Sequence, residues 1–152
     1  MVDIHNTSEL NNILNKLQPN AKPLWGKMSP QHIIEHLAMA VKISTGRINS
    51  KFYSTVEEAE KIKSHVIHSQ AELTQGIKNP ILTDEPPTLV YPDLTTAISE
   101  LHKEVDHFKS YYEKNKGAIH TQPRMGDLNH AEWLTLHNKH FTHHFKQYGL
   151  TE

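Results

Sequence analysis

The chain has 152 residues, which is the length of one ordinary domain built around one hydrophobic core. Its 16 basic and 17 acidic residues nearly balance, so charge gives no reason to expect nucleic acid or an anionic membrane as a partner. Cysteine is absent, which excludes disulfides, cysteine nucleophiles and cysteine-ligated zinc. With no long apolar run and no visible secretion signal, we expect a cytoplasmic protein with a single domain, residues 1–152.

Two helical patterns occupy the first third of the chain. Residues 8–18 place three leucines and an isoleucine on one face, which predicts a short helix. Ser29 is suited to cap a second helix, because its side chain can accept hydrogen bonds from the free amides of the first turn. Pro30 fits the first helical position, and we expect this helix to run to Gly46.

A third helix is predicted from the stretch "TVEE", in which Thr55 and Glu58 have the spacing of a capping box. Its pattern fades before Gly76. Residues 76–92 then contain four prolines and predict a long irregular loop, of a kind that is uncommon in a small domain and often functional. The short stretch "TLVYP" within it is the only candidate for a β-strand.

Two longer helices complete the pattern. Asp93 is expected to cap a helix through "LTTAISELHKEVDHFKSYYEKNKG". After a loop around Pro123 and Gly126, Asn129 is expected to cap a last helix that ends at Gly149. Four substantial helices and a short leading one predict an all-α fold, a four-helix bundle with a short N-terminal helix and a long proline-rich loop.

Thirteen histidines are the main chemical clue, but chance alone produces pairs at helical spacing, so their orientation must carry the argument. On the last helix, His140 and His144 are one turn apart. They lie within or beside the apolar arc, as does His137, while Lys139 and Thr142 face the other way. Imidazoles buried on such a stripe are costly unless each ring nitrogen has a partner.

A metal ion would provide such a partner. Two imidazoles from one helix and a third from a facing helix form a three-ligand site with open positions, as in catalytic zinc sites. His36, on the second helix, is the best third ligand by orientation, and His32 and His137 are weaker candidates. The alternative is that these histidines are hydrogen-bonded core or boundary residues, and the residues alone leave both interpretations open.

The stretch "HIIEH", residues 32–36, matches the H-x-x-E-H signature of inverzincin proteases. That chemistry requires the glutamate beside the metal-bound water, whereas helical phase places Glu35 on the solvent side, with Lys42. The match to the protease signature is therefore interpreted as a chance sequence match.

Three stretches resemble a known family: "KMSPQHIIEHL", "HFTHHFKQ" and "PPTLVYPDLTTAISELHKEVDHF". They are similar to the DinB/YfiT-like superfamily of proposed metalloenzymes, and in particular to a branch of small bacterial proteins of unknown function. The late motif of that superfamily, H-x-x-H-H-x-x-Q, is reproduced by His140, His143, His144 and Gln147. The resemblance implies a four-helix bundle that binds a divalent metal, zinc or nickel, through His36, His140 and His144.

Three neutral imidazoles would leave the metal its full charge, which acidifies a bound thiol or water. The resemblance favours an S-transferase that uses a low-molecular-weight thiol on a small electrophilic substrate; the alternatives are a metal-dependent hydrolase, or a non-catalytic metal-binding or dimerising bundle. No residue is assigned as catalytic. Four polar residues of the fourth helix could orient the ligands: His102, Glu104, Asp106 and His107. Such residues more often lie on the solvated face of a helix.

Overall fold

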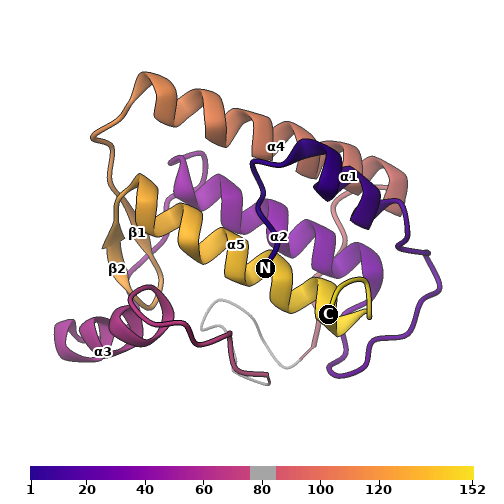
Figure 1. The fold of residues 1–152 in the computed structure, drawn as a ribbon, viewed down its shortest axis with the longest axis horizontal. Helices are drawn as coiled ribbons and strands as arrows, with labels where there is room; N and C mark the ends of the chain where they lie inside the picture. The colour runs from indigo at the N-terminus through magenta and orange to yellow at the C-terminus, as the bar shows by residue number, and fades with distance from the viewer. Residues whose placement is uncertain (76–84) are drawn as a thin grey trace.

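The computed structural model describes residues 1–75 and 85–152, which form five helices and a two-stranded sheet (Figure 1). In chain order these elements are α1 (Thr7–Leu14), α2 (Pro30–Ser44), α3 (Val56–Val66), α4 (Leu94–Lys114), β1 (His120–Gln122), β2 (Gly126–Leu128) and α5 (His130–Gln147). The helices α4, α2 and α5 lie side by side, and α3 is set apart from them near the sheet (Figure 1).

Local capping explains where the helices begin. The Ser29 side chain accepts a hydrogen bond from the amide of His32, and the Thr55 and Asn129 side chains do the same for the glutamates three residues on. Each of these pairs is a capping box, in which the third residue bonds back to the cap. At the far end of α5, Gly149 has φ +63°, the left-handed conformation that commonly ends a helix.

The hydrophobic core lies between α2, α4 and α5, with α1 packed over it. Helix α2 makes its main contacts with α4 and α5. Its fully buried side chains include Ile33, Leu37 and Val41, which face Leu101 and Phe108 of the opposing core surface. The core is thus built on one central helix, and that helix also carries a candidate metal ligand.

The region around Pro123 is a β-hairpin and not the plain loop that we expected. Strands β1 and β2 pair antiparallel, with His120 opposite Leu128 and Gln122 opposite Gly126. Strands of three residues are too short for an alternating pattern to show in the sequence, which explains why they were not predicted. The predicted strand candidate "TLVYP", residues 88–92, is not a strand; it is irregular.

Lys139 and Thr142 of α5 are buried, contrary to the expectation that they face solvent. The exposed fractions of the two residues are 5% and 4%. Thr142 is covered by the N-terminal segment, because its hydroxyl accepts a hydrogen bond of 2.9 Å from the amide of Val2, itself 2% exposed. The face of α5 opposite the main core is therefore also packed.

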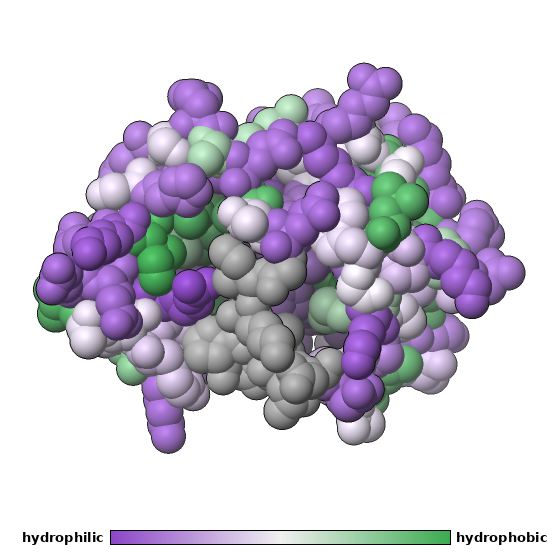
Figure 2. Space-filling view, turned by 90° about the horizontal axis from the view of Figure 1, so that it is seen from below, coloured by the Kyte–Doolittle hydropathy of each residue, from purple (hydrophilic) through white to green (hydrophobic). Residues whose placement is uncertain are grey.

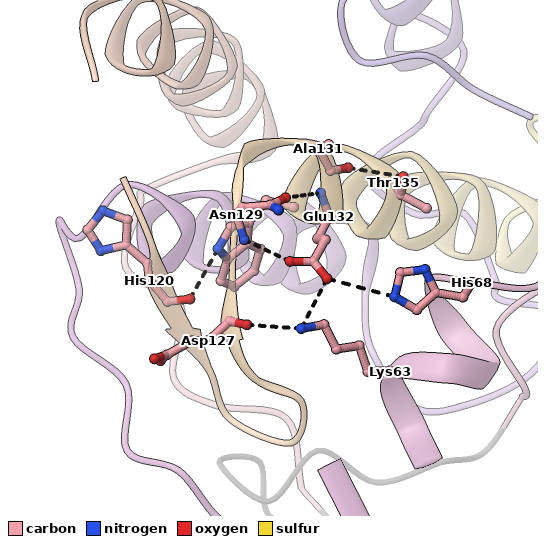
Figure 3. Close-up of polar contacts among 9 residues, drawn as sticks. Lys63, His68, His120, Asp127, Asn129, Ala131, Glu132 and Thr135 are labelled. Atoms are coloured by element: carbon pink, nitrogen blue, oxygen red, sulfur yellow. Dashed lines mark hydrogen bonds and ion pairs between the residues drawn. The ribbon is translucent and has the colours of Figure 1, made fainter. Parts of the chain in front are cut away.

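Helix α3 is held to the hairpin and to the start of α5 by polar contacts (Figure 3). Lys63 Nζ lies 3.0 Å from Glu132 Oε2 and donates a hydrogen bond of 3.3 Å to the carbonyl of Asp127. His68, just after the helix, lies 3.9 Å from the same glutamate. Ala59 is the one buried residue of α3, and Ile62 and Val66 pack against the core while partly exposed, so both apolar and polar side chains attach this helix.

The described residues are mostly helical, but they are not an all-α four-helix bundle of the predicted kind. The short α3 lies outside the layer of α2, α4 and α5, and a two-stranded sheet is present. Part of the predicted proline-rich loop, residues 76–84, lies outside the described residues, and residues 86–90 are irregular as expected. None of the described helices is long and apolar enough to cross a membrane.

Candidate metal centre

Three imidazoles meet where α2 faces α5. His36 of α2 places its Nε2 atom 2.9 Å from Nε2 of His140, and His144 places its Nε2 atom 3.1 Å from the same atom. Each of the three residues offers one ring nitrogen that lies within 4.8 Å of the other two. The convergence of His36, His140 and His144 predicted from helical phase is therefore present in the fold.

All three rings are held in the uncharged form that metal coordination requires. Burial lowers the pKa of His36 to about 4, with a further contribution from His143, and burial lowers that of His144 to about 3. The pKa of His140 lies well below its usual value, first because its ring is removed from bulk water and then because the other imidazoles surround it.

Hydrogen bonds among the three rings cannot satisfy all of the converging nitrogen atoms. Gln147 donates through its Nε2 atom to the carbonyl of Trp25 at 2.8 Å, so its Oε1 atom faces Nδ1 of His144, also at 2.8 Å, and accepts the proton there. A neutral His144 then has a bare lone pair at Nε2. Two contacts converge on Nε2 of His140, one from His36 and one from His144, yet that atom carries at most one proton. The two contacts therefore cannot both be full hydrogen bonds.

The donor set fits a divalent metal ion. Three imidazole nitrogens at the zinc–nitrogen distance of about 2.0–2.1 Å would lie about 3.3 Å apart in tetrahedral geometry, close to the two spacings of 2.9 and 3.1 Å at His140. Imidazole also suits nickel and copper. One feature departs from the usual pattern: Nδ1 of His36 is buried and has no hydrogen-bond partner among the described residues, whereas metal-bound histidines commonly donate from that position.

A pocket of about 510 Å³ lies beside the three histidines, within the range of small-molecule sites. The walls come from α2, α3, α5, the loop before α2 and the hairpin turn. The apolar side chains that line it include Met28, Met39, Ile43, Ile62, Val66 and Leu136. Seen from below, apolar residues are recessed among hydrophilic ones on this side of the molecule (Figure 2).

The two weaker ligand candidates have other partners. His32 completes the capping box of α2, with Nδ1 2.6 Å from the Ser29 hydroxyl and Nε2 3.0 Å from the carbonyl of Pro87. His137 is fully buried, and its Nε2 atom lies 2.9 Å from the hydroxyl of Ser44. Neither belongs to the group of ring nitrogens that converge.

Glu35 does not belong to this group either, which agrees with the rejection of a protease motif. Its Oε1 atom accepts a hydrogen bond of 2.7 Å from the amide of Val90, and its Oε2 atom accepts one from Tyr91 and one from Gln31. The glutamate of "HIIEH" thus ties the segment before α4 to α2.

The charged residues of α4 also have local roles. Glu104 is 4% exposed and pairs with Arg47 at 3.0 Å, and within the described residues none of its hydrogen bonds or ion pairs reaches the three histidines. The residues of the site that the sequence did not reveal are those of the hairpin turn, Pro123, Arg124 and Met125, which line the pocket. In the sequence, Pro123 and Gly126 indicate a turn at these residues, but they do not indicate that the turn lies beside the pocket.

The fold and the site define a mostly helical protein in which three uncharged imidazoles converge beside an apolar pocket. Within that class, the chain belongs to the DUF1569 family, described as proteins of unknown function, whose family model matches residues 1–150. No curated protein and no solved structure matches the chain.

This finding corrects the assignment to the DinB/YfiT-like superfamily, which is wrong: the matching family is DUF1569, and no DinB or YfiT family is found. Expectations that rested on that resemblance alone lose its support. The argument from the orientation of the histidines does not depend on it, because it used only helical phase and the chemistry of imidazole.

Proposed function

We propose that His36, His140 and His144 bind one divalent metal ion, zinc or nickel, and that the adjoining pocket binds a small electrophilic substrate. The observation that supports this most is the approach of three uncharged Nε2 atoms to one another with too few protons to join them. When bound, the metal would acidify a coordinated thiol or water and so supply a nucleophile near neutral pH.

The surrounding residues would hold and shield the reacting groups. Gln147 fixes the orientation of the His144 ring, and the apolar walls of the pocket exclude water and bind the carbon skeleton of a substrate. Among the described lining residues, the one carboxylate is Glu72, and its Oε1 atom is engaged by Lys146 at 2.7 Å. The part of the lining that the structure describes therefore offers no free carboxylate as a general base.

This lack favours thiol transfer over hydrolysis. A small thiol would lose its S–H proton on binding, the sulfur would form a bond to an electrophilic carbon, and the leaving group would depart with its bonding electrons. Hydrolysis additionally requires protons to be moved from water to a leaving group during the reaction. A hydrolase is the second candidate, supported by His143, which lines the pocket with its ring centre 5.0 Å from that of His144 and could accept a proton.

Elemental analysis of tag-free protein tests the metal site. We expect about one zinc or nickel per chain in the parent and almost none in a His140→Ala, His144→Ala double variant. His65→Ala is the matched control, because His65 lines the same pocket but lies outside the converging group. A parent protein that stays metal-poor after exposure to zinc and nickel would contradict the proposal. Metal-loaded protein would next be screened for transfer of small thiols to a chromogenic aryl halide.

A further inference from the structure

Three cationic side chains line the pocket, and two of them already face a carboxylate. Lys27 Nζ lies 3.6 Å from Glu85, and Lys61 Nζ lies 3.6 Å from Glu57. Arg124 differs, because its guanidinium makes no hydrogen bond or ion pair within the part of the chain that the structure describes. Within that part, the guanidinium of this partly buried arginine therefore has all its donors free in an apolar wall.

Among the residues that the structure describes, the pocket offers this guanidinium no free counter-ion. Glu72 is the one carboxylate of the described lining, and the pKa of Glu72 is lowered by its hydrogen bond with Lys146. That carboxylate is therefore ionised but already paired. Because Lys27, Lys61 and Glu72 each face a partner of opposite charge, Arg124 is the cation of the described lining that is left to attract an anion.

The backbone that carries Arg124 is also held in place before any ligand binds. It lies in the turn between β1 and β2, where Gln122 Oε1 accepts hydrogen bonds from the amides of Arg124 at 2.7 Å and Met125 at 2.8 Å. The carbonyl of Pro123 accepts a further bond of 2.7 Å from the amide of Tyr53. Because Pro123 and Met125 are buried, the backbone of the turn is fixed, and little ordering would be needed when a ligand binds.

We propose that Arg124 binds the carboxylate of a small amphipathic substrate whose apolar body fills the pocket and whose reacting end lies at His36, His140 and His144. This assignment of substrate class rests on the proposed metal site. A guanidinium pairs with a carboxylate through two parallel hydrogen bonds. One free guanidinium matches one such group, whereas a phosphate dianion would call for more cationic donors than this wall leaves unpaired.

Binding of defined thiols to the cobalt(II)-loaded protein tests the proposal. The probes are a series of straight-chain thiols of increasing length that end in a carboxylate, each compared with the thiol of the same length that ends in an alcohol. The thiolate-to-cobalt absorption band reports binding at the metal. At the best length we expect the carboxylate to bind about tenfold or more tightly than the alcohol, as a charge-assisted hydrogen bond allows.

Two variants separate a specific contact from general charge. Arg124→Gln is expected to abolish the preference for the carboxylate, and Lys61→Gln, which removes a paired cation from the same pocket, is expected to leave most of it. Equal binding of acid and alcohol by the loaded parent would overturn the role of Arg124. So would an equal loss of preference in both variants.

A metal-free measurement distinguishes failure of this inference from failure of the metal site. Octanoate is titrated into protein stripped of metal, and the fluorescence of the pocket tryptophans Trp25 and Trp133 is followed. If cobalt does not bind but octanoate still binds more weakly to Arg124→Gln than to Lys61→Gln, the metal site is wrong and the carboxylate site stands. If cobalt binds and octanoate shows no dependence on Arg124, the carboxylate site is wrong.

Discussion

At the scale of single residues, two histidines of α5 are held in opposite tautomers. The side-chain oxygen of Gln147 accepts a hydrogen bond from Nδ1 of His144, which leaves Nε2 of that ring with a free lone pair. Ser44 donates its hydroxyl proton to the carbonyl of Val41 at 2.6 Å, so it accepts from Nε2 of His137. Hydrogen-bond partners thus decide which histidine presents Nε2 as a ligand, and His137 is not a substitute for His144.

Substitution of Gln147 tests this assignment. In Gln147→Leu, we expect zinc affinity to fall by about 10- to 100-fold, the usual effect of losing a partner that orients a ligand. Gln147→Glu is the matched control: it keeps an acceptor for His144 but loses the donor to the carbonyl of Trp25, so it should retain affinity and lose stability. Competition with a chromogenic chelator measures the affinity. Equal zinc affinities in Gln147→Leu and the parent would show that this hydrogen bond does not orient the ring.

The space around Gln147 is also set by a glycine. Gly26 has φ +80°, and a Cβ atom added there would lie 2.8 Å from Nε2 of Gln147. The loop before α2 can therefore approach the end of α5 closely enough for the carbonyl of Trp25 to accept from the amide.

At the scale of elements, one lysine of α5 fixes the segment that follows α3. Lys139 Nζ donates to the carbonyls of Val66, Ser69 and Ala71 at 2.5, 2.9 and 2.8 Å. All three donors of the ammonium are used, which compensates for its burial. Because Val66 also lines the pocket, this contact holds one wall in place beside the candidate metal centre.

Lys139→Met should loosen that wall while the layer of α2, α4 and α5 stays folded. We expect hydrogen-exchange protection of residues 66–71 to fall by about tenfold or more, because three hydrogen bonds to a charged donor are lost. Lys146→Met is the comparison, since it removes only the ion pair with the exposed Glu72. Unchanged protection in Lys139→Met, measured by mass spectrometry, would mean that α3 is held by other contacts such as those of Lys63.

At the scale of the whole molecule, the features readable from sequence are those set by local spacing. Capping by Ser29 and Asn129 depends on residues three positions away, and the convergence of His140 and His144 depends on one helical turn. Such features were predicted. That His36 lies opposite them also followed from helical phase, once the two apolar faces were assumed to meet. Metal binding by these residues stays a prediction.

The features that sequence did not reveal depend on distant parts of the chain. Thr142 and Lys139 are buried because the N-terminal segment around Val2 and the turn after α3 cover them. A local sequence pattern does not predict such contacts between distant segments. Arg124 lines the pocket because a short hairpin brings it there. The apolar faces therefore indicated most of the core, whereas the pocket wall could be found only from the fold.

Buried neutral histidines also link the stability of the whole molecule to pH. His137 is fully buried, and burial lowers its pKa from the ordinary value near 6.5 to about 3. Between these two values the unfolded chain binds a proton that the folded chain does not. The free energy of unfolding therefore decreases as pH falls below about 6.5, and buried His36 and His144 act in the same direction.

His137→Phe should weaken this dependence, because an aromatic ring of similar shape then fills the site between Trp133 and Phe108 without a titrating nitrogen. We expect the slope of unfolding free energy against pH, between about pH 6 and 4, to be smaller than in the parent by about 1.4 kcal/mol per pH unit. Denaturant unfolding in the presence of a chelator measures both slopes free of metal effects. Identical slopes would mean that His137 is protonated in the folded protein. Its Nδ1 atom, which is buried without a hydrogen-bond partner in residues 1–75 and 85–152, would then have to find one.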